Sequence, residues 1–486
     1  MMRIAIVHFH LQTGGVTRVI QHACQALADA GHKVVVLCGA PPHQPLDERA
    51  LVRVLPGLGY EESRSSVGPR TLAAAMSQAA GEALGAAPDL WHAHNHSLGK
   101  NLALPGALRV LIQAGDRLLL QLHDFAEDGR PALYQRMLAD IADQDSARLA
   151  ELLYPIAPQV HYAVLNARDH AFLAAAGIPP ANLHTLPNAI TIDASPLGAV
   201  SAPVHRPRLW LYPTRSIRRK NIGEFLLWAA LGGEQDLFAT TQAPLNPTEQ
   251  PGYRHWVAVA KELKLPVEFE ISRRITDYPT LIASSHAFVT TSIAEGFGMA
   301  FLEPWLADRP LAGRDLPEIT TDFVSSGIDL STLYPRLPIP LDWIDAKAVQ
   351  RRMAAALGAI ARAYSRPREP DDLDRAWAAA TVGGNIDFGR LDEPAQEQVI
   401  RLVAGSPAHD LPLTLESPTA REQQQPIRSN RALIERRFML NTYQDRLLAI
   451  YDATTAALPA PISGSAQITT LLDKFLAPER LFLLRI

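Results

Sequence analysis

The sequence predicts an α/β protein built from two doubly wound domains. Apolar, strand-like runs alternate with segments of helical periodicity, an order typical of a parallel sheet covered by helices. The periodicity is lost between residues 187 and 207, where proline, serine and glycine gather, and the alternation then starts again. A length of 486 residues also exceeds what one ordinary hydrophobic core organises. We therefore expect domains over residues 1–195 and 206–430, joined by a hinge.

The first domain begins with an apolar run at residues 4–9, which we expect to form a buried strand. The residues QTGG interrupt this run, and apolar positions then recur at helical spacing up to Gly31. Further strands are expected at residues 33–38, 90–94 and 117–123. Two domains of this kind place a cleft between the carboxyl ends of their sheets, where such folds usually bind ligands.

The second domain repeats the alternation. Its expected strands cover residues 208–213, 236–241, 267–271 and 287–292, and its expected helices cover residues 221–231, 253–263 and 278–284. Residues 330–430 match no pattern that we can place. A helical tail is expected over residues 431–486, with a strong helical pattern at 438–458.

Composition excludes several classes of protein. The net charge is −4, which argues against a protein built to bind nucleic-acid phosphates. No apolar run is long enough to cross a bilayer, so no transmembrane segment is expected. Only two cysteines occur, Cys24 and Cys38, and they lie in no metal-ligand spacing. We expect both to pack in the core of a protein from a reducing compartment, the cytoplasm.

A glycine-rich turn separates two glutamates. The stretch AFVTTSIAEGFGMAFLEPW predicts a strand, a turn and a helix, so the amides of Gly298, Met299 and Ala300 are expected at a helix N-terminus suited to phosphate. Glu295 precedes the turn, and Glu303 is expected about two helical turns further on. Carboxylates accept two hydroxyl donors and suit a sugar or a ribose. The alternative is that Glu295 caps the helix and Glu303 is solvated.

Two cations follow the first strand of the second domain. Arg215 lies just beyond the strand end, and Lys220 opens the next helix. At the carboxyl edge of a parallel sheet they can neutralise a diphosphate leaving group. For the neighbouring Arg218 and Arg219 we favour an exposed basic patch.

Five segments of the chain together resemble the retaining glycosyltransferases of family 4, which have the GT-B fold. These segments are TGGVTRVIQHACQALADAGHKV, LLLQLHDF, LPNAI, TRSIRRKN and EGFGMAFLE, and they occur in family order within residues 1 to about 325. The resemblance implies two Rossmann-like domains facing across a cleft, with the helical tail returning to the first domain. It also implies transfer of a hexose from a nucleotide-diphosphate sugar to an acceptor hydroxyl.

The resemblance also implies roles for individual residues. Glu303 is similar to the glutamate that holds the ribose hydroxyls, and Glu295 to the one that contacts the transferred sugar. Arg215 and Lys220 resemble the pair that stabilises the departing diphosphate. His123 resembles a histidine that contacts the donor sugar.

In the first domain, Gly14 and Gly15 are expected to let backbone amides approach the diphosphate. The sequence TGG is not the dinucleotide fingerprint, so a dehydrogenase is a poor interpretation. On the acceptor side we expect Asn95, His96 and Asp124 to face the cleft. The acceptor itself stays open among a small metabolite, a glycan, a lipid and a protein.

No bound cofactor and no metal requirement are expected. The residues DDLD at 371–374 have a metal-binding spacing, but we interpret them as a helix N-terminus. Pro304 departs from the family pattern, so the helix must start late or bend there. The alternative functions are a non-catalytic or epimerase-like GT-B protein that binds a nucleotide sugar or a carbohydrate.

Overall fold

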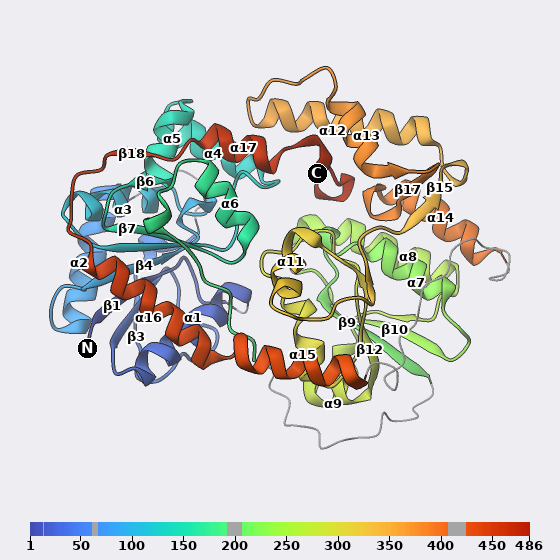
Figure 1. Cartoon of the computed structure of the whole chain (residues 1–486), viewed down its shortest axis with the longest axis horizontal. Helices are drawn as coiled ribbons and strands as arrows, with labels where there is room; N and C mark the ends of the chain where they lie inside the picture. Colours follow the sequence, from blue (N-terminus) through green and yellow to red (C-terminus); the bar gives the residue numbers. More distant parts are fainter. Residues whose placement is uncertain (13, 61–66, 192–206, 407–423) are drawn as a thin grey trace. The chain divides into compact units, whose positions relative to one another are not determined.

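The computed structural model describes residues 1–12, 14–60, 67–191, 207–406 and 424–486, and it divides into two compact units. Unit 1 comprises Met1–Ala189, Ala363–Arg366 and Phe438–Leu476. Unit 2 comprises Ile190–Arg362, Pro367–Arg437 and Ala477–Ile486. Most of the expected hinge at 187–207 lies outside the described residues. Each unit has a parallel sheet covered by helices, which confirms the predicted fold class (Figure 1).

The sheet of unit 1 has seven strands in the order β3-β2-β1-β4-β5-β7-β8, and all its pairings are parallel. The strands are β1 (Arg3–Val7), β2 (Lys33–Cys38), β3 (Leu51–Val54), β4 (Leu90–His94), β5 (Leu118–Leu122), β7 (Val160–Val164) and β8 (Leu183–Thr185). The strand order reverses between β1 and β4, so their carboxyl ends form the crevice where doubly wound sheets bind ligands.

Helices cover both faces of this sheet because its central strands are apolar on both sides. The helices of unit 1 are α1 (Gly15–Asp29), α2 (Pro69–Leu84), α3 (Ala103–Gln113), α4 (Pro131–Ala142), α5 (Ser146–Leu153), α6 (Ala167–Ala175), α16 (Leu440–Ala456) and α17 (Ile468–Phe475). A short antiparallel pair joins β6 (Pro155–Ile156) to β18 (Gly464–Ser465). Cys24 and Cys38 are free and buried, which confirms their expected place in the core.

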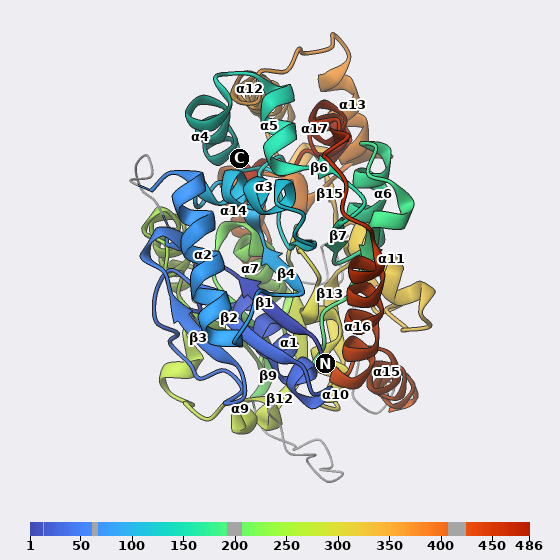
Figure 2. The same cartoon turned by 90° about the vertical axis from the view of Figure 1, so that its left-hand side faces the viewer.

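Helix α16 belongs to unit 1 although it is far away in sequence. It packs against α1 (Figure 2), and Tyr443, Leu447, Ile450 and Tyr451 join the same hydrophobic core as Ile20. The periodicity at 438–458 correctly predicted this helix.

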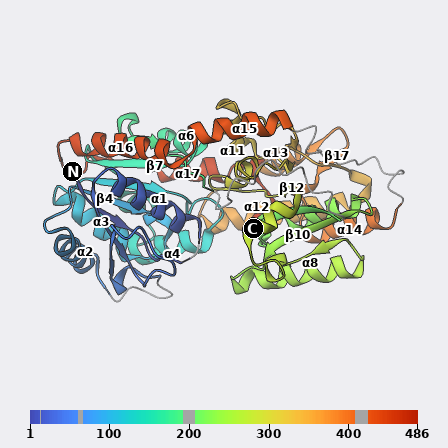
Figure 3. The same cartoon turned by 90° about the horizontal axis from the view of Figure 1, so that it is seen from below.

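The sheet of unit 2 has six strands in the order β11-β10-β9-β12-β13-β14, again paired in parallel. The strands are β9 (Arg208–Arg215), β10 (Asp236–Gln242), β11 (Val267–Glu268), β12 (Ser285–Thr290), β13 (Leu311–Arg314) and β14 (Leu333–Tyr334). The helices are α7 (Ile222–Leu231), α8 (Gln250–Glu262), α9 (Tyr278–Ser284), α10 (Glu303–Leu306), α11 (Pro317–Ser325), α12 (Ala346–Ala363), α13 (Asp372–Ala380), α14 (Glu393–Ala404) and α15 (Gln424–Arg437). Figure 3 shows α8 running along the sheet, where Trp256 and Val259 share a core with Phe238 of β10.

The region that the sequence pattern left unplaced completes unit 2. A small antiparallel sheet forms from β15 (Pro338–Pro340), β17 (Asn385–Asp387) and β16 (Thr381–Val382). Helices α12, α13 and α14 follow or flank it, and Phe388 and Val399 lie in one core with Trp210 of β9. Much of residues 330–404 is therefore an integral part of the second α/β unit.

Two elements differ from the sequence expectation. The strand expected at 267–271 ends at Glu268, because Glu270 adopts a left-handed φ of 56° and Ile271 starts a 3-10 turn. The helix expected after the glycine turn is only the four-residue α10. Pro304 lies in its first turn, where its missing N–H costs nothing, which confirms the expected late start.

Candidate functional site

Two loops meet at the carboxyl edge of the sheet in unit 2. One loop follows β9, whose last residue is Arg215, and carries Lys220; the other follows β12 and carries Glu295. The N–H of Ile293 donates to the carbonyl of Arg219 at 3.0 Å, and the Thr291 hydroxyl donates to the carbonyl of Lys220 at 2.9 Å. Adjacent parallel strands bring these distant residues together.

Lys220 and Glu295 form an ion pair between the ammonium Nζ and the carboxylate Oε1. Both side chains are mostly buried, with 14% and 11% of their surfaces exposed. Burial acts to raise the pKa of Glu295, but the charges of Lys220 and Arg219 outweigh it, so the pKa lies below its usual value. Glu295 is therefore ionised at neutral pH and acts as a hydrogen-bond acceptor.

Arg215 has no carboxylate partner among the described residues. Its Nε donates to the neutral amide oxygen of Gln242 at 3.2 Å. The guanidinium charge is consequently available to an anionic ligand. Sequence reasoning missed Gln242, which orients Arg215 from the neighbouring strand β10.

Arg218 is exposed over 38% of its side-chain surface, as expected, but its charge is paired. Its Nη2 donates to the Glu393 carboxylate at 2.8 Å, and its backbone N–H donates to Glu249 at 2.8 Å. The sequence pattern around Arg218 does not reveal this pairing, because Glu393 lies far along the chain. Arg219 is not a freely exposed residue, since its charge helps to hold Glu295 ionised.

The glycine turn after Glu295 leads to Glu303, which begins the short helix α10. Gly298 has a φ of 88°, and a side chain there would come within 2.8 Å of the Phe301 ring. Met299 to Phe301 form a 3-10 turn, and Glu303 is the first residue of α10. The expectation that Glu303 lies two helical turns into a long helix is wrong, because a tight turn and Pro304 delay the helix. Ala300 is the middle residue of that turn.

In unit 1, His123 follows β5 at the carboxyl edge. Its Nε2 lies 2.9 Å from Nδ1 of His94, and the two rings stack with centroids 5.2 Å apart. Burial lowers the pKa of His123 to about 4, so the imidazole is neutral at pH 7. A neutral ring can exchange hydrogen bonds with a hydroxyl but supplies no charge.

Asn95 organises the loop that carries His123. Its side-chain oxygen accepts from the backbone N–H of His123 at 2.7 Å and of Asp124 at 3.1 Å. His96 is 1% exposed, and its Nε2 lies 2.7 Å from the carbonyl of Leu153. These buried positions differ from the expectation that Asn95 and His96 face a ligand. Asp124 keeps partial exposure and pairs with Arg130 at 2.6 Å.

The glycines of the first motif stand at the start of α1. A side-chain carbon on Gly15 would meet no atom within 4 Å, and one on Gly14 would meet only the Gln12 carbonyl at 3.9 Å. The backbone is thus open to a ligand. Thr13 lies outside the described residues.

Residues 371–374 begin α13, as the sequence predicted. Asp371 is its N-cap, and Asp372 and Asp374 lie in the first turn, where they complement the helix dipole. Within the described ranges, no group of three or more His, Cys, Asp or Glu side chains has a geometry for a metal ion. No described helix is long and apolar enough to cross a membrane.

Comparison with known proteins finds relatives for both the sequence and the fold. Residues 13–194 match the sequence model described as Glycosyltransferase Family 4. Over 389 residues the chain is 29% identical to a mannosylglucosyl-3-phosphoglycerate synthase of Petrotoga mobilis, covering 74% of this chain and 74% of that protein.

Solved structures with this fold include sucrose-phosphate synthase from Thermosynechococcus elongatus, with a TM-score of 0.54 and 15% identity over 94% of this chain and 100% of that chain. Anabaena HepE, solved in complex with UDP and glucose, has a TM-score of 0.51 and 14% identity over 93% of this chain and 100% of that chain. These likenesses establish the GT-B fold. The chain is a glycosyltransferase whose residues 13–194 match family 4.

Proposed function

We propose that the protein is a retaining glycosyltransferase that moves a hexose from a nucleotide-diphosphate sugar to an acceptor hydroxyl. The observation that carries this proposal is Arg215, a cation without a carboxylate partner in the described residues, at the end of the strand that leads to Lys220 and its ion pair with Glu295. The two cations, Arg215 and Lys220, suit the diphosphate of a nucleotide sugar. The ionised carboxylate of Glu295 suits the hydroxyls of its sugar.

The leaving group determines what the cations do. As the bond between the anomeric carbon and the diphosphate oxygen breaks, negative charge grows on the diphosphate and positive charge on the sugar ring. Arg215 and Lys220 stabilise the departing diphosphate, and backbone amides near Gly14, Gly15, Gly298, Met299 and Ala300 add hydrogen bonds to it. Fixed positive groups of this kind act in a site with little water, where each is worth more than in solution.

Carboxylates and a neutral imidazole hold the sugar nucleotide. Glu295 accepts hydrogen bonds from hydroxyls of the transferred sugar, and Glu303 accepts them from the ribose. His123 contacts a sugar hydroxyl as a neutral hydrogen-bonding partner, since burial keeps its pKa at about 4. A complex of Anabaena HepE with UDP-glucose supports a nucleotide sugar as donor for proteins of this fold.

The acceptor attacks from the face that the diphosphate leaves. The acceptor oxygen forms the new bond to the anomeric carbon, and its proton passes to an oxygen of the departing diphosphate. The anomeric configuration is retained, and no protein base is required in this scheme.

An anionic acceptor fits the carboxyl edge of unit 1. Lys100 follows β4 and makes no ion pair within the described part of the chain; its ammonium lies 5.2 Å from the ring centre of Tyr60. Burial and the positive charges of Arg130 and Arg136 lower the pKa of Lys100, so an added anion would be stabilised there. The name of the Petrotoga relative, which includes a phosphoglycerate, supports an acceptor that carries a phosphate or carboxylate.

The function is tested with the purified full chain. The melting temperature is measured with UDP, GDP, ADP and their glucose and mannose conjugates, because a ligand of the folded state raises it. The donor found is then incubated with a glucoside of 3-phosphoglycerate and with an uncharged glucoside. We expect one nucleotide to raise the melting temperature, and the product, analysed by NMR, to keep the donor's anomeric configuration.

Other results would change the proposal in defined ways. Inversion of the anomeric centre would overturn the retaining mechanism. Binding of a nucleotide sugar without transfer to any hydroxyl would favour an epimerase-like role. Absence of binding to every nucleotide would favour a non-catalytic carbohydrate-binding protein.

A further inference from the structure

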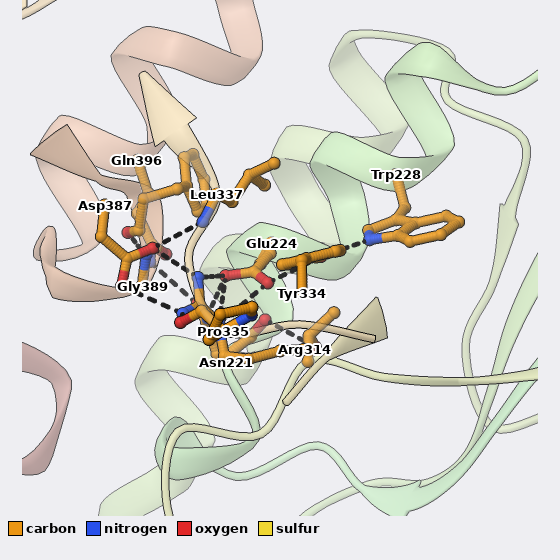
Figure 4. Close-up of polar contacts among 12 residues, drawn as sticks. Asn221, Glu224, Trp228, Arg314, Tyr334, Pro335, Leu337, Asp387, Gly389 and Gln396 are labelled. Atoms are coloured by element: carbon orange, nitrogen blue, oxygen red, sulfur yellow. Dashed lines mark hydrogen bonds and ion pairs between the residues drawn. The ribbon is translucent and has the colours of Figure 1, made fainter. Parts of the chain in front are cut away.

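A buried polar network ties the far end of unit 2 to the loop that carries Lys220. We name it the Arg314 network and define it as Asn221, Glu224, Arg314, Tyr334, Asp387 and Gln396 (Figure 4). Its six members come, in chain order, from the loop before α7 and from α7, β13, β14, β17 and α14. The network therefore connects residues that sequence patterns assigned to separate regions.

The centre of the network is one guanidinium between two carboxylates. Arg314 donates from Nη2 to Glu224 at 2.7 Å and to Asp387 at 2.8 Å. The three side chains are 1%, 0% and 4% exposed, respectively. Although burial acts to raise the pKa of Asp387, Arg314 holds it below its usual value; burial raises the pKa of Glu224.

Glu224 has a donor on every side. Besides Arg314, it accepts from the Tyr334 hydroxyl at 2.9 Å and from Nδ2 of Asn221 at 2.8 Å. The Trp228 indole N–H in turn donates to the Tyr334 hydroxyl at 2.7 Å. Since both oxygens of this carboxylate accept hydrogen bonds, its position is fixed by the fold.

Asn221 links the Glu224 carboxylate to the adjacent Lys220. Its backbone is left-handed, with a φ of 52°, and its side chain is held at both ends. Nδ2 donates to Glu224, and Oδ1 accepts from Nε2 of Gln396 at 2.8 Å. The carbonyls of Lys220 and Asn221 also lie 2.9 and 3.1 Å from the Thr291 hydroxyl, on the loop that leads to Glu295.

Helix α14 holds the same loop at a second point. Glu393, three residues before Gln396, pairs with Arg218 at 2.8 Å, so one face of α14 contacts the loop twice. Gln396 of α14 packs tightly against α7, because a side-chain carbon on Gly223 would lie 2.2 Å from Oε1 of Gln396. Buried polar networks add little stability compared with apolar packing, so a role in positioning accounts better for this one.

We propose that Gln396 is a positioning residue of the donor site, which acts through Asn221 to hold Lys220 where it meets the diphosphate of the donor. The inference rests on the proposed function and extends it. It assigns a role to α14, which lies outside the segments that resemble the family, in setting the affinity for a nucleoside diphosphate.

The test measures nucleoside-diphosphate binding to the full chain by calorimetry, using whichever of UDP, GDP or ADP the unsubstituted protein binds. Gln396→Leu removes the hydrogen bond to Asn221, and we expect about a tenfold weaker affinity. The matched control is Gln398→Leu on the same helix, where Nε2 donates to the carbonyl of Trp343 at 3.0 Å. We expect this control to bind within about twofold of the unsubstituted protein.

A double-substitution cycle separates positioning from general damage. If Gln396 acts through Lys220, Gln396→Leu will cause little further loss in a Lys220→Ala background, because coupled residues are not additive. A full tenfold loss in that background would show a purely structural effect and would overturn the inference. If Gln396→Leu does not fold, Asn221→Gly removes the same link while glycine keeps the left-handed backbone.

The inference and the proposed function fail in different ways. Binding that depends on Lys220 and not on Gln396 would overturn the inference alone. An unsubstituted protein that binds none of the three nucleoside diphosphates would overturn the proposed function, and with it this inference.

Discussion

At the scale of single residues, cations that are close in sequence have different roles. Arg218 is neutralised by Glu393 and serves structure, whereas the guanidinium of Arg215 donates to the neutral Gln242. Lys220 pairs with Glu295, which keeps that carboxylate ionised. The distinction depends on which partners the fold brings, and residue type alone does not reveal it.

Arg215→Ala is expected to lower kcat by roughly 10- to 100-fold. The substitution removes a charge-assisted contact to the leaving diphosphate, which corresponds to about 1.5–3 kcal/mol. Transfer is measured under saturating donor. Arg254→Ala, an exposed arginine of α8, is the control and is expected to keep full activity. Unchanged transfer by Arg215→Ala would remove Arg215 from the mechanism.

Lys100→Ala is expected to raise KM for an anionic acceptor about tenfold and to leave nucleotide affinity unchanged. The reason is the loss of a cation at the edge of unit 1 that is not among the residues proposed to hold the nucleotide. Initial rates are compared between a phosphorylated and an uncharged glucoside. An equal effect on both acceptors would contradict a role in recognising negative charge.

At the scale of secondary-structure elements, helix α16 completes unit 1 from the far end of the chain. Tyr451 contributes both apolar surface and a polar contact, because its hydroxyl lies 2.8 Å from Nδ1 of the buried His92. Nε2 of His92 is 2.9 Å from the side-chain oxygen of Gln121. The helix thus fixes a histidine on β4, two residues from His94 and its contact with His123.

Tyr451→Phe is expected to destabilise the protein by about 1–3 kcal/mol, because it leaves His92 with an unpaired buried nitrogen. Tyr443→Phe on the same helix is a matched control, since the Tyr443 hydroxyl is buried and lacks a hydrogen-bond partner among the described residues. We expect it to be neutral or stabilising. Thermal unfolding of both variants decides this, and equal losses would show that the His92 contact contributes nothing.

At the scale of the whole molecule, buried histidines make stability depend on pH. Burial lowers the pKa of His8 and His92 to about 3, and of His96 and His123 to about 4, from an ordinary 6.5. Below pH 6.5 the unfolded chain therefore binds more protons than the folded one, and stability falls as the pH drops. Glu127 acts in the opposite direction, because burial raises its pKa to about 7.

His96→Gln isolates one histidine from these opposing groups. Glutamine can still donate to the carbonyl of Leu153 but does not titrate. Between pH 7 and pH 4 the variant is expected to lose less stability than the unsubstituted protein, by up to about 3 kcal/mol. Thermal melts across this range provide the comparison. Parallel pH profiles for the two proteins would contradict the assignment.

Local sequence patterns predict the α/β class, the alternation of both units and most of their strands, because buried parallel strands and amphipathic helices leave a local pattern. They also brought out Arg215, Lys220, Glu295 and Glu303, since short motifs at strand ends lie within single loops. Pro304 predicted the late start of the helix at Glu303, because its ring restricts the local backbone and removes an N–H donor.

The pairing of polar groups is visible in the three-dimensional structure and not in the sequence. The ion pairs of Lys220 with Glu295 and of Arg218 with Glu393, and the burial of Arg314 between Glu224 and Asp387, join residues separated by many positions. Such contacts depend on the register of neighbouring strands and on where distant helices pack, and no local pattern records them. For the same reason residues 330–404 were left unplaced by the sequence, although the fold makes them part of the core of unit 2 and of the support for Lys220.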